Sequence, residues 1–515
     1  MDSTYEMTWG RALVRSMCHY PDKIAVQDER AGLTYKQFNE RVNRLANALT
    51  GRGLQKGDRL ASLSGNCLEL MELFLASLKI GVIPCPLDVR GLLEDQVVEM
   101  ELVKPLMLAF HPDLTERARE LIKKTSDGIR MVVLGGSKEL PFGGTEQLVD
   151  QGSPVEPAAD VRGDDVAFIL FTGGTTGKPK GVMLTHLNLI WNAVNVIGEN
   201  GSPSPDSRIY YPMQIYHSGA LSRFLASLYA GGTFIATRTL DPVAYLDALE
   251  REHCTFVVGN TAIWNMLLEE GKRRKRDTRS ITSWLHAQGD ITPEFHDEVK
   301  GVLFPNGLMY ASYALTEASP GVTVLRPQDH PRKWPGIGRP YMTMEVRLVD
   351  HRDQDVPVGE PGQILLRGPN IMKGYYNNPE ETAAAMAGGW LHTGDVASGD
   401  DLGFLYFEDR LKDIIKSGGL NIFSREVENA IMTHPGVDEV AVIGVPHPKW
   451  GETVRAIVVP LPGVMLTQED IIGHCKAHLA SHKKPTSVVF TDALPRGSFG
   501  SKVLKKILRE KFGQA

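Results

Sequence analysis

The sequence predicts an α/β protein with a large amino-terminal part and a small carboxy-terminal domain. Between residues 35 and 260, segments with apolar residues at helical spacing alternate with short apolar runs. Strands that alternate with helices usually build parallel or mixed sheets with helices on their faces. From about residue 345 the pattern changes to short strands joined by turns, followed by a compact mixture of helices and strands. That change predicts a separate α+β domain at the carboxy-terminal end.

The elements of the amino-terminal part follow from local patterns. Residues 35–53 carry apolar residues at helical spacing and end in glycine, which predicts a helix. Residues 68–85 are the most apolar segment, but Glu72 and Lys79 interrupt it. Because it is too short and too charged for a membrane span, it predicts a buried helix that runs into a strand. Further on we expect a strand at 165–174 that ends in a glycine loop, a helix at 187–200 and a strand at 256–261.

The carboxy-terminal elements are shorter and are separated by turns. Residues 344–368 predict a strand, a turn and a strand, and residues 402–408 predict another short strand. After these we expect helices at 424–433 and 467–480 and strands at 437–445 and 453–459. The domain boundary is placed between Asp409 and Arg410, so that the two domains cover residues 1–409 and 410–515.

The composition is that of an ordinary soluble protein. Of the 515 residues 42% are apolar and 23% are charged, and the net charge of −6 does not indicate nucleic acid as a partner. The five cysteines are scattered and form no CxxC pair, which argues against a disulfide framework or zinc site and favours the cytoplasm. The acidic start, MDSTYEMTWG, has no apolar core and is not expected to be a signal peptide. The basic run 272–276 has two interpretations. It is a patch that binds phosphate or anionic lipid, which would allow peripheral membrane contact, or it is a solvated helix end. We favour the solvated helix end.

One segment has the composition of a phosphate-binding loop. Residues 171–182 read FTGGTTGKPKGV, with glycines that let backbone N–H groups approach an anion, and with threonine hydroxyls and lysines that bind it. A Walker A loop is excluded, because Pro179 follows Lys178 where a hydroxyl residue is needed, and Thr172 stands where the first glycine is needed. A flexible hairpin is the alternative, but a hairpin needs neither three threonines nor two lysines.

This loop resembles the signature loop of the adenylate-forming enzymes: acyl-CoA synthetases, luciferases and the adenylation domains of peptide synthetases. Four further segments resemble the family's motifs and occur in the family's order. They read SYALTEAS (312–319), WLHTGD (390–395), DRLKDIIKSGGLNI (409–422) and LPRGSFGSKVLKKIL (494–508). The resemblance therefore covers nearly the whole chain. It implies a β-barrel-like subdomain within the large domain and a mobile carboxy-terminal domain.

The resemblance implies a set of contacts to ATP and magnesium. Glu317 would hold Mg²⁺, Thr316 would contact the α-phosphate, and Tyr313 would stack on adenine. Asp395 would accept hydrogen bonds from the ribose hydroxyls, which suits a carboxylate, and Arg410 would contact the ribose. The remaining expected nucleotide contacts are Thr172, Gly173, Gly174, Thr175, Thr176, Gly177, Lys180 and Tyr406.

The resemblance also implies residues for the second half of the reaction. Lys412 would be the hinge, and Lys416 and Asn421 would lie near the phosphate and acyl groups. The loop Ser417, Gly418, Gly419, Leu420 and Asn421 would line the tunnel for the pantetheine arm, although such a segment taken alone could be a tight turn. Lys502 aligns with the catalytic lysine, but Ser501 stands where the family has glycine. Lys505 and Lys506 are the competing candidates.

The acyl pocket is the least specified part of the site. His217 matches the family's histidine at the pocket mouth, and the region 210–221 holds no acid to pair with a substrate ammonium, which disfavours an α-amino acid. Gln288 and Gly289, in a segment that departs from the family pattern, are expected to border the substrate. Trp264, Met213 and Tyr216 are equally suited to line the pocket or to belong to the core.

These features predict an AMP-forming carboxylate–CoA ligase that uses ATP, Mg²⁺ and coenzyme A. The acid is expected to be an apolar fatty, aryl or alicyclic one. One alternative is an enzyme that loads the thiol of a carrier protein, and a luciferase-like oxidative second step is a weaker one. Another class, a non-catalytic sensor of nucleotide or acyl group, stays open because of Ser501 and the segment 286–290. A homodimer is also left open.

Overall fold

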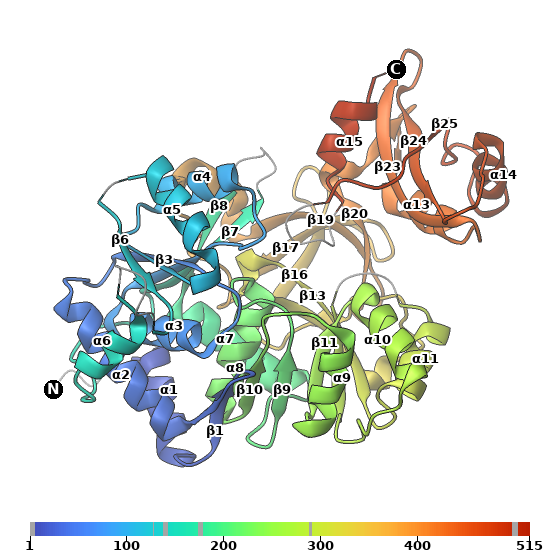
Figure 1. Cartoon of the computed structure of the whole chain (residues 1–515). Helices are drawn as coiled ribbons and strands as arrows, with labels where there is room; N and C mark the ends of the chain where they lie inside the picture. The colour runs from blue at the N-terminus through green and yellow to red at the C-terminus, as the bar shows by residue number, and fades with distance from the viewer. Residues whose placement is uncertain are drawn as a thin grey trace. The chain divides into compact units, whose positions relative to one another are not determined.

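The computed structural model describes residues 6–126, 128–136, 143–173, 179–287, 291–496 and 503–514 (Figure 1). The contacts between Cα atoms divide the chain into two compact units. Unit 1 consists of residues 1–345 and 366–391, and unit 2 consists of residues 346–365 and 392–515. The boundary expected between Asp409 and Arg410 separates parts of the chain that would move about a hinge, which is a different criterion from contacts between Cα atoms. It stays a prediction.

The main sheet of unit 1 has nine strands in the order β15-β14-β13-β12-β11-β9-β10-β1-β2. All neighbours from β13 to β1 are parallel, while the edge pairs β13–β14, β14–β15 and β1–β2 are antiparallel. The predicted α/β class with parallel and mixed sheets is therefore confirmed. The strands are β1 (Ile24–Gln27), β2 (Gly32–Thr34), β9 (Arg208–Tyr211), β10 (Thr233–Ala236), β11 (Phe256–Gly259), β12 (Ser283–Ala287), β13 (Leu308–Ala314), β14 (Gly321–Leu325) and β15 (Arg339–Pro340).

Helices cover this sheet because each presents an apolar face to it. The helices α9 (Pro242–Arg251), α10 (Thr261–Arg273) and α11 (Pro293–Val302) pack side by side (Figure 1). Trp264 of α10 and Trp284 of β12 are fully buried and meet edge to face, with ring centroids 5.4 Å apart. Helices α7 (His186–Glu199) and α8 (Ser218–Ala230) pack against each other. The helix expected at 187–200 and the strand expected at 256–261 are thus present.

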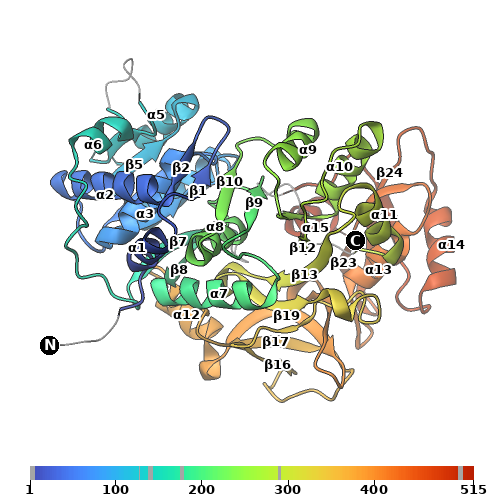
Figure 2. The same ribbon diagram turned by 90° about the horizontal axis from the view of Figure 1, so that it is seen from below.

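A second, parallel sheet of unit 1 has the order β4-β3-β5-β6. Figure 2 shows α1, α2 and α3 grouped beside it. Every residue of α3 is buried, and its three charges are paired: Glu69 with Arg30, Glu72 with Arg41, and Lys79 with Glu156. The buried helix that runs into a strand is therefore confirmed. The elements are β3 (Arg59–Leu63), β4 (Ile83–Pro86), β5 (Met107–Phe110), β6 (Arg130–Val133), α1 (Trp9–His19), α2 (Tyr35–Gly51), α3 (Leu68–Ile80), α4 (Leu93–Val103), α5 (Thr115–Lys124) and α6 (Thr145–Gln151).

A third sheet of unit 1, in the order β18-β8-β7, contains the described ends of the phosphate-loop candidate. The strands β7 (Val166–Gly173) and β8 (Pro179–Thr185) are antiparallel neighbours, so they bring Thr172 opposite Lys180. Strand β18 (Gly374–Tyr375) pairs with β8 from almost two hundred residues further along the chain, and α12 (Pro379–Ala385) follows it.

Unit 2 combines two sheets. The first has the order β16-β17-β19-β20, and the second has the order β22-β21-β24-β23, with β25 beside β24. Valine and isoleucine side chains of β23, β24 and α13 form the core of the second sheet. In unit 2 the predicted strands and helices are present to within a few residues, and β19, β21, β22, β25 and α15 are additional elements. The elements of unit 2 are β16 (Glu345–Val349), β17 (Gly362–Arg367), β19 (Leu391–Gly399), β20 (Leu405–Arg410), β21 (Ile415–Ser417), β22 (Leu420–Ile422), α13 (Ser424–Met432), β23 (Val437–His447), β24 (Gly451–Pro460), α14 (Gln468–His478), β25 (Ser487–Phe490) and α15 (Lys505–Phe512).

Three further expectations can be compared with the structure. In the basic run, the side chain of Arg276 is only 1% exposed and pairs with Asp247 and Glu270 at 2.9 and 2.8 Å, while Lys272 pairs with Glu298. Arg274 also pairs with Asp247, and residues 272–275 are exposed at the end of α10, which agrees with the favoured solvated helix end. All five cysteines are free thiols, and four of them are buried. No helix in the described part of the chain has the length and hydropathy of a transmembrane segment.

Candidate active site

The turn that follows β13 carries two of the predicted catalytic residues. After Ala314 the chain forms a 3₁₀ turn over Thr316–Ala318, which places Thr316 and Glu317 at the carboxyl end of the central parallel strands. Ligands of open α/β sheets bind at this edge. The hydroxyl oxygen of Thr316 lies 3.1 Å from that of Ser218, the residue directly after His217. The fold therefore brings the predicted phosphate and acyl-pocket residues together.

The segment 370–376 holds this turn in place. The backbone N–H of Met372 donates to the carbonyl of Glu317 at 2.8 Å, and the Asn370 amide donates to the carbonyls of Ala318 and Gly321, both at 2.8 Å. The hydroxyl of Tyr375 donates to Oε1 of Glu317 at 3.1 Å. Burial and the Glu317 carboxylate raise the pKa of Tyr375, so its hydroxyl keeps its proton and acts as a donor.

Tyr375 also contacts Lys180, the lysine of the phosphate-loop candidate. The Lys180 ammonium lies 5.0 Å from the centre of the Tyr375 ring and forms an ion pair with Glu381 at the start of α12. One tyrosine thus lies between a lysine suited to phosphate and a carboxylate suited to a metal ion. Motif reading missed both Tyr375 and Glu381. The sequence GYYNNPEET offered no signal by itself, because the contact depends on the pairing of β18 with β8.

The donor set around Glu317 suits a magnesium ion that arrives with a phosphate ligand. Tyr375 binds Oε1 of Glu317, and no described residue is hydrogen-bonded to Oε2. Among the described residues there is no group of three His, Cys, Asp or Glu side chains that could hold a metal alone. Mg²⁺ usually binds through one or two carboxylates, substrate phosphates and water, and not in an all-protein cage. The residues present therefore fit a Mg²⁺–ATP complex.

The predicted acyl-pocket histidine precedes α8. His217 is partly buried, and its ring meets that of Tyr216 edge to face at 4.3 Å. Burial, and next the charge of Arg90, lower the pKa of His217 to about 3, so the imidazole is neutral near pH 7. Trp264 lies in the core, where its indole N–H donates to Nδ1 of His286 at 3.1 Å, so it does not line a pocket. Tyr313 lies in β13 opposite Thr323 of β14.

In unit 2 the two predicted ribose contacts are neighbours. Asp395 in β19 and Arg410 in β20 are cross-strand partners, and Arg410 Nε lies 3.4 Å from Oδ1 of Asp395. The backbone N–H of Asp395 donates to the hydroxyl of Thr393 at 3.0 Å. Tyr406 lies four residues away on β20, where its hydroxyl donates to Asp400 at 3.1 Å. The structure therefore joins Asp395 to Arg410 but places the Tyr406 hydroxyl elsewhere on the hairpin.

The predicted hinge and pantetheine loop form a tight hairpin in unit 2. Lys412 is exposed in a short 3₁₀ turn, and Lys416 pairs with Asn421 across strands β21 and β22. Gly418 and Gly419 form the two-residue connection, with φ of 58° and 85°. Glycine is favoured at both positions because type I′ hairpin turns need positive φ. The tight-turn interpretation and the loop role are thus compatible.

Several predicted residues lie outside the described residues. They are Lys502, Ser501, Gln288, Gly289, Gly174, Thr175, Thr176 and Gly177. Of the two competing lysines, Lys505 is engaged in a structural contact: it pairs with Glu428 at 2.7 Å and donates to the Ser424 hydroxyl at 2.6 Å. Lys506 is exposed, and its nearest carboxylate is that of Glu510 at 4.0 Å. The preference for Lys502 stays a prediction.

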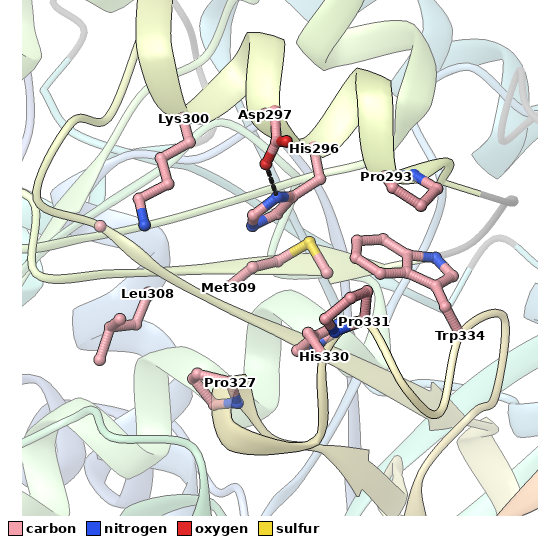
Figure 3. Close-up of a pocket in the computed structure, with 11 residues that line it drawn as sticks. Pro293, His296, Asp297, Lys300, Leu308, Met309, Pro327, His330, Pro331 and Trp334 are labelled. Carbon is pink, nitrogen blue, oxygen red and sulfur yellow. Dashed lines mark hydrogen bonds and ion pairs between the residues drawn. The ribbon is translucent and has the colours of Figure 1, made fainter.

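A pocket of about 210 Å³ lies at the other end of β13 (Figure 3). One face of α11, the start of β13 and the turn 327–334 enclose it, and His296, His330 and Trp334 are among its lining residues. Leu308, on its wall, is five residues from Tyr313, about 17 Å along an extended strand. None of the predicted site residues lines this pocket, so it is separate from the candidate active site.

Comparison with known protein families covers both ends of the chain. A family model described as "AMP-binding enzyme" matches residues 13–376, and the model described as "AMP-binding enzyme C-terminal domain" matches residues 426–500. The first match spans the phosphate-loop candidate, the turn with Thr316 and Glu317, and Tyr375.

Curated relatives match over almost their entire length. A feruloyl-CoA synthase from Amycolatopsis sp is 37% identical over 96% of both chains. The 3-[(3aS,4S,7aS)-7a-methyl-1,5-dioxo-octahydro-1H-inden-4-yl]propanoyl:CoA ligase of Rhodococcus jostii is 34% identical over 97% of this chain and 98% of its own. Among solved structures, ATP-bound MatB from Rhodopseudomonas palustris has a TM-score of 0.89 and 28% identity over 99% of both chains.

The expected class of enzyme, an AMP-forming acid–thiol ligase, is confirmed by these relatives. The expected fold is confirmed by the agreement with MatB along the whole chain. The chain therefore belongs to the AMP-binding enzyme family, a family of adenylate-forming enzymes.

Proposed function

We propose that this protein activates an apolar carboxylic acid with ATP and transfers the acyl group to coenzyme A. The observation that carries the proposal is the juxtaposition of Lys180 and Glu317 on either side of Tyr375. A cation for phosphate and a carboxylate for Mg²⁺ are thereby held next to the acyl-pocket segment, through the contact of Thr316 with Ser218. Such preorganised charges are what phosphoryl chemistry requires.

In the first half-reaction, a carboxylate oxygen of the acid attacks the α-phosphorus of ATP. The bond from that phosphorus to the bridging oxygen of pyrophosphate breaks, which yields acyl-adenylate and pyrophosphate. Lys180 and the loop at 172–177 would bind the β- and γ-phosphates, and Thr316 would bind the α-phosphate. Lys502 would offset the negative charge that develops during the attack. Glu317 would hold Mg²⁺, which supplies charge neutralisation to the triphosphate when bound. Asp395 and Arg410 would bind the ribose and Tyr313 the adenine.

In the second half-reaction, the CoA thiolate attacks the acyl carbonyl and AMP leaves. We propose that residues 410–515 turn about Lys412 between the two steps, which replaces Lys502 by the hairpin Ser417–Asn421. The exposure of that hairpin in unit 2 supports its availability for the pantetheine arm. The acid–thiol ligases among the relatives support the choice of CoA over a carrier-protein thiol.

The acid is proposed to be an aryl, alicyclic or fatty acid. Relatives are named for a feruloyl, a hydrindane-propanoyl and a long-chain fatty acyl substrate, which supports a large apolar acyl group without choosing among the three. The neutral ring of His217 and the buried ring of Tyr216 agree with such a group. A cytoplasmic location, which the five free cysteine thiols support, and a homodimer are further parts of the proposal.

The test is pyrophosphate release from ATP and Mg²⁺ with a panel of carboxylic acids, with and without CoA. We expect one acid class to drive release and CoA to accelerate it with formation of a thioester. Release that CoA does not affect would support a carrier-protein thiol. No release with any acid, while ATP still binds, would support a sensor. Lys502→Ala is expected to abolish release and to leave ATP binding measurable.

A further inference from the structure

The ion pair between Lys180 and Glu381 is built by a rigid local structure. Strand pairing sets Tyr375 beside β8, and the turn that follows leads directly into α12. The side-chain oxygen of Asn378 caps α12 by accepting the N–H of Glu381 at 3.2 Å. The Thr382 hydroxyl accepts the N–H of Tyr375 at 2.9 Å and donates to the Asn378 carbonyl at 2.8 Å. These bonds aim the Glu381 side chain at Lys180.

Both partners of this pair are largely shielded from water. The Lys180 side chain is 15% exposed and that of Glu381 is 31% exposed. Opposite charges attract more strongly as solvent is excluded, so the pair is held more firmly than one on an open surface. Glu380, the preceding residue on the same helix, is exposed instead. The lysine expected to bind phosphate is thus already neutralised by a carboxylate of its own chain.

We propose that Glu381 is a resident counter-ion that competes with the triphosphate of ATP for Lys180. The proposal rests on the proposed function, in which Lys180 binds the β- and γ-phosphates. A phosphate oxygen and the Glu381 carboxylate cannot both occupy the same ammonium face, and two anions side by side repel each other. Binding of ATP then requires Lys180 to leave Glu381.

Competition of this kind sets the apparent affinity for the nucleotide. ATP binds only to molecules in which Lys180 has left Glu381. Its apparent dissociation constant is therefore the intrinsic one divided by the fraction of molecules in that state. The same competition acts on the product pyrophosphate. When pyrophosphate leaves, Glu381 pairs with Lys180 again and so opposes rebinding of pyrophosphate. Tyr375 is a positioning residue in this arrangement: its ring spaces Lys180 from Glu317, so that the carboxylate expected to hold the metal does not take the lysine.

The experiment is a double-mutant cycle on the full-length protein, with Mg²⁺–ATP and AMP binding measured by calorimetry. Glu381→Gln keeps the shape of the side chain and removes its charge, and we expect it to tighten ATP binding about five- to thirtyfold. AMP, which lacks the β- and γ-phosphates, should bind as before. Glu380→Gln is the matched control and should change neither affinity by more than about twofold. In a Lys180→Ala background, Glu381→Gln should have no effect on ATP.

Kinetics distinguish a counter-ion from a structural contact. In Glu381→Gln we expect the KM for ATP and the inhibition constant for pyrophosphate to fall together, with kcat not raised. Glu381→Asp, which keeps the charge on a shorter side chain, should lie between wild type and Glu381→Gln. Unchanged or weaker ATP binding in a folded Glu381→Gln variant would overturn the proposal, as would an equal gain in affinity for AMP.

Failure of the proposed function gives a different pattern. If Lys180→Ala leaves ATP affinity unchanged, the phosphate role of Lys180 is wrong and the counter-ion role is overturned with it. If no acid drives pyrophosphate release, the ligase activity is wrong. The binding cycle between Lys180 and Glu381 still decides the counter-ion question in that case.

Discussion

Asp409 offers the sharpest test of how β20 is joined to α13 in unit 2. Its side chain is buried, with the residue 4% exposed. Its Oδ2 accepts the N–H of Ser424 at 2.5 Å, the hydroxyl of Ser424 at 2.7 Å and the N–H of Arg425 at 3.3 Å. Its Oδ1 accepts the N–H of Arg410 at 2.8 Å. No side chain at the N-cap position of α13 forms a capping bond, so Asp409 caps this helix from a distant strand.

The perturbation is Asp409→Asn, which keeps the shape but removes the charge and one acceptor. A hydrogen bond to a charged group contributes about 1.5–3 kcal/mol, and a negative charge at a helix N-terminus contributes roughly 0.3–1 kcal/mol. Asparagine keeps one acceptor oxygen, so we expect a net loss of about 3 kcal/mol at this junction. At 1.4 kcal/mol per factor of ten, the junction should open about a hundredfold more often.

The assay is amide hydrogen exchange on the full-length protein. Amides in the first turns of α13 should exchange about a hundredfold faster in Asp409→Asn than in wild type, because exchange follows local opening. Asp438→Asn is the control, since Asp438 is an exposed carboxylate on β23 of the same unit. A change of less than about threefold in α13, or an equal change in the control, would refute the assignment of Asp409 as its cap.

Four further outcomes are expected. Glu317→Gln should raise the Mg²⁺ concentration needed for half-maximal rate and lower pyrophosphate release by about 10²–10³, as loss of one preorganised charge does. Asp395→Asn should raise the KM for ATP by about 10- to 100-fold through loss of a charged acceptor, measured by initial rates with ATP and with 2′,3′-dideoxy-ATP. Because burial lowers the pKa of His217 to about 3, the unfolded chain binds its proton near pH 6.5 and the folded chain does not. Stability should therefore fall as pH falls from 6.5 toward 3, by about 1.4 kcal/mol per unit from this residue, which urea unfolding at several pH values measures. Gly418→Ala places a side chain at φ of 58° and about 2.8 Å from the Trp450 ring, so it should slow acyl transfer from preformed acyl-adenylate to CoA more than it slows adenylation.

Each of these outcomes has a matched contradiction. If Glu317→Gln leaves the Mg²⁺ requirement unchanged, Glu317 does not bind the metal ion. An equal rise in KM for ATP and the dideoxy analogue would show that Asp395 does not act through the ribose hydroxyls. A His217→Asn variant with the wild-type pH slope would assign that slope to other groups. Equal slowing of both half-reactions in Gly418→Ala would indicate a general loss of fold.

The amino-acid sequence predicted the parts of this protein that depend on neighbours along the chain. The period of apolar residues placed the helices α2, α3 and α7, because burial of one face imposes that period, and short apolar runs placed the strands β7 and β11. The order of the glycine loop, the turn at Thr316, the Asp395 strand and the Lys412 hinge indicated the adenylate-forming family. These motifs could be read because each keeps its functional groups within a few residues of one another.

The same reading left alternatives open where a contact joins distant segments. It gave Trp264 equal chances of lining the pocket or lying in the core, and favoured a solvated helix end for the run that contains Arg276. Packing against Trp284 decided the first, and ion pairs with Asp247 and Glu270 decided the second.

Only the tertiary structure decided what surrounds the lysine of the phosphate loop. The pairing of β18 with β8 sets Tyr375 and Glu381 beside Lys180 across almost two hundred residues. No local pattern marks such a pair, because strand pairing is chosen by the burial of whole sheets and not by the residues that happen to meet. The sequence by itself therefore determined the elements, the family and the motif residues. The fold determined which charges neutralise one another before a substrate arrives, since that depends on distance in space.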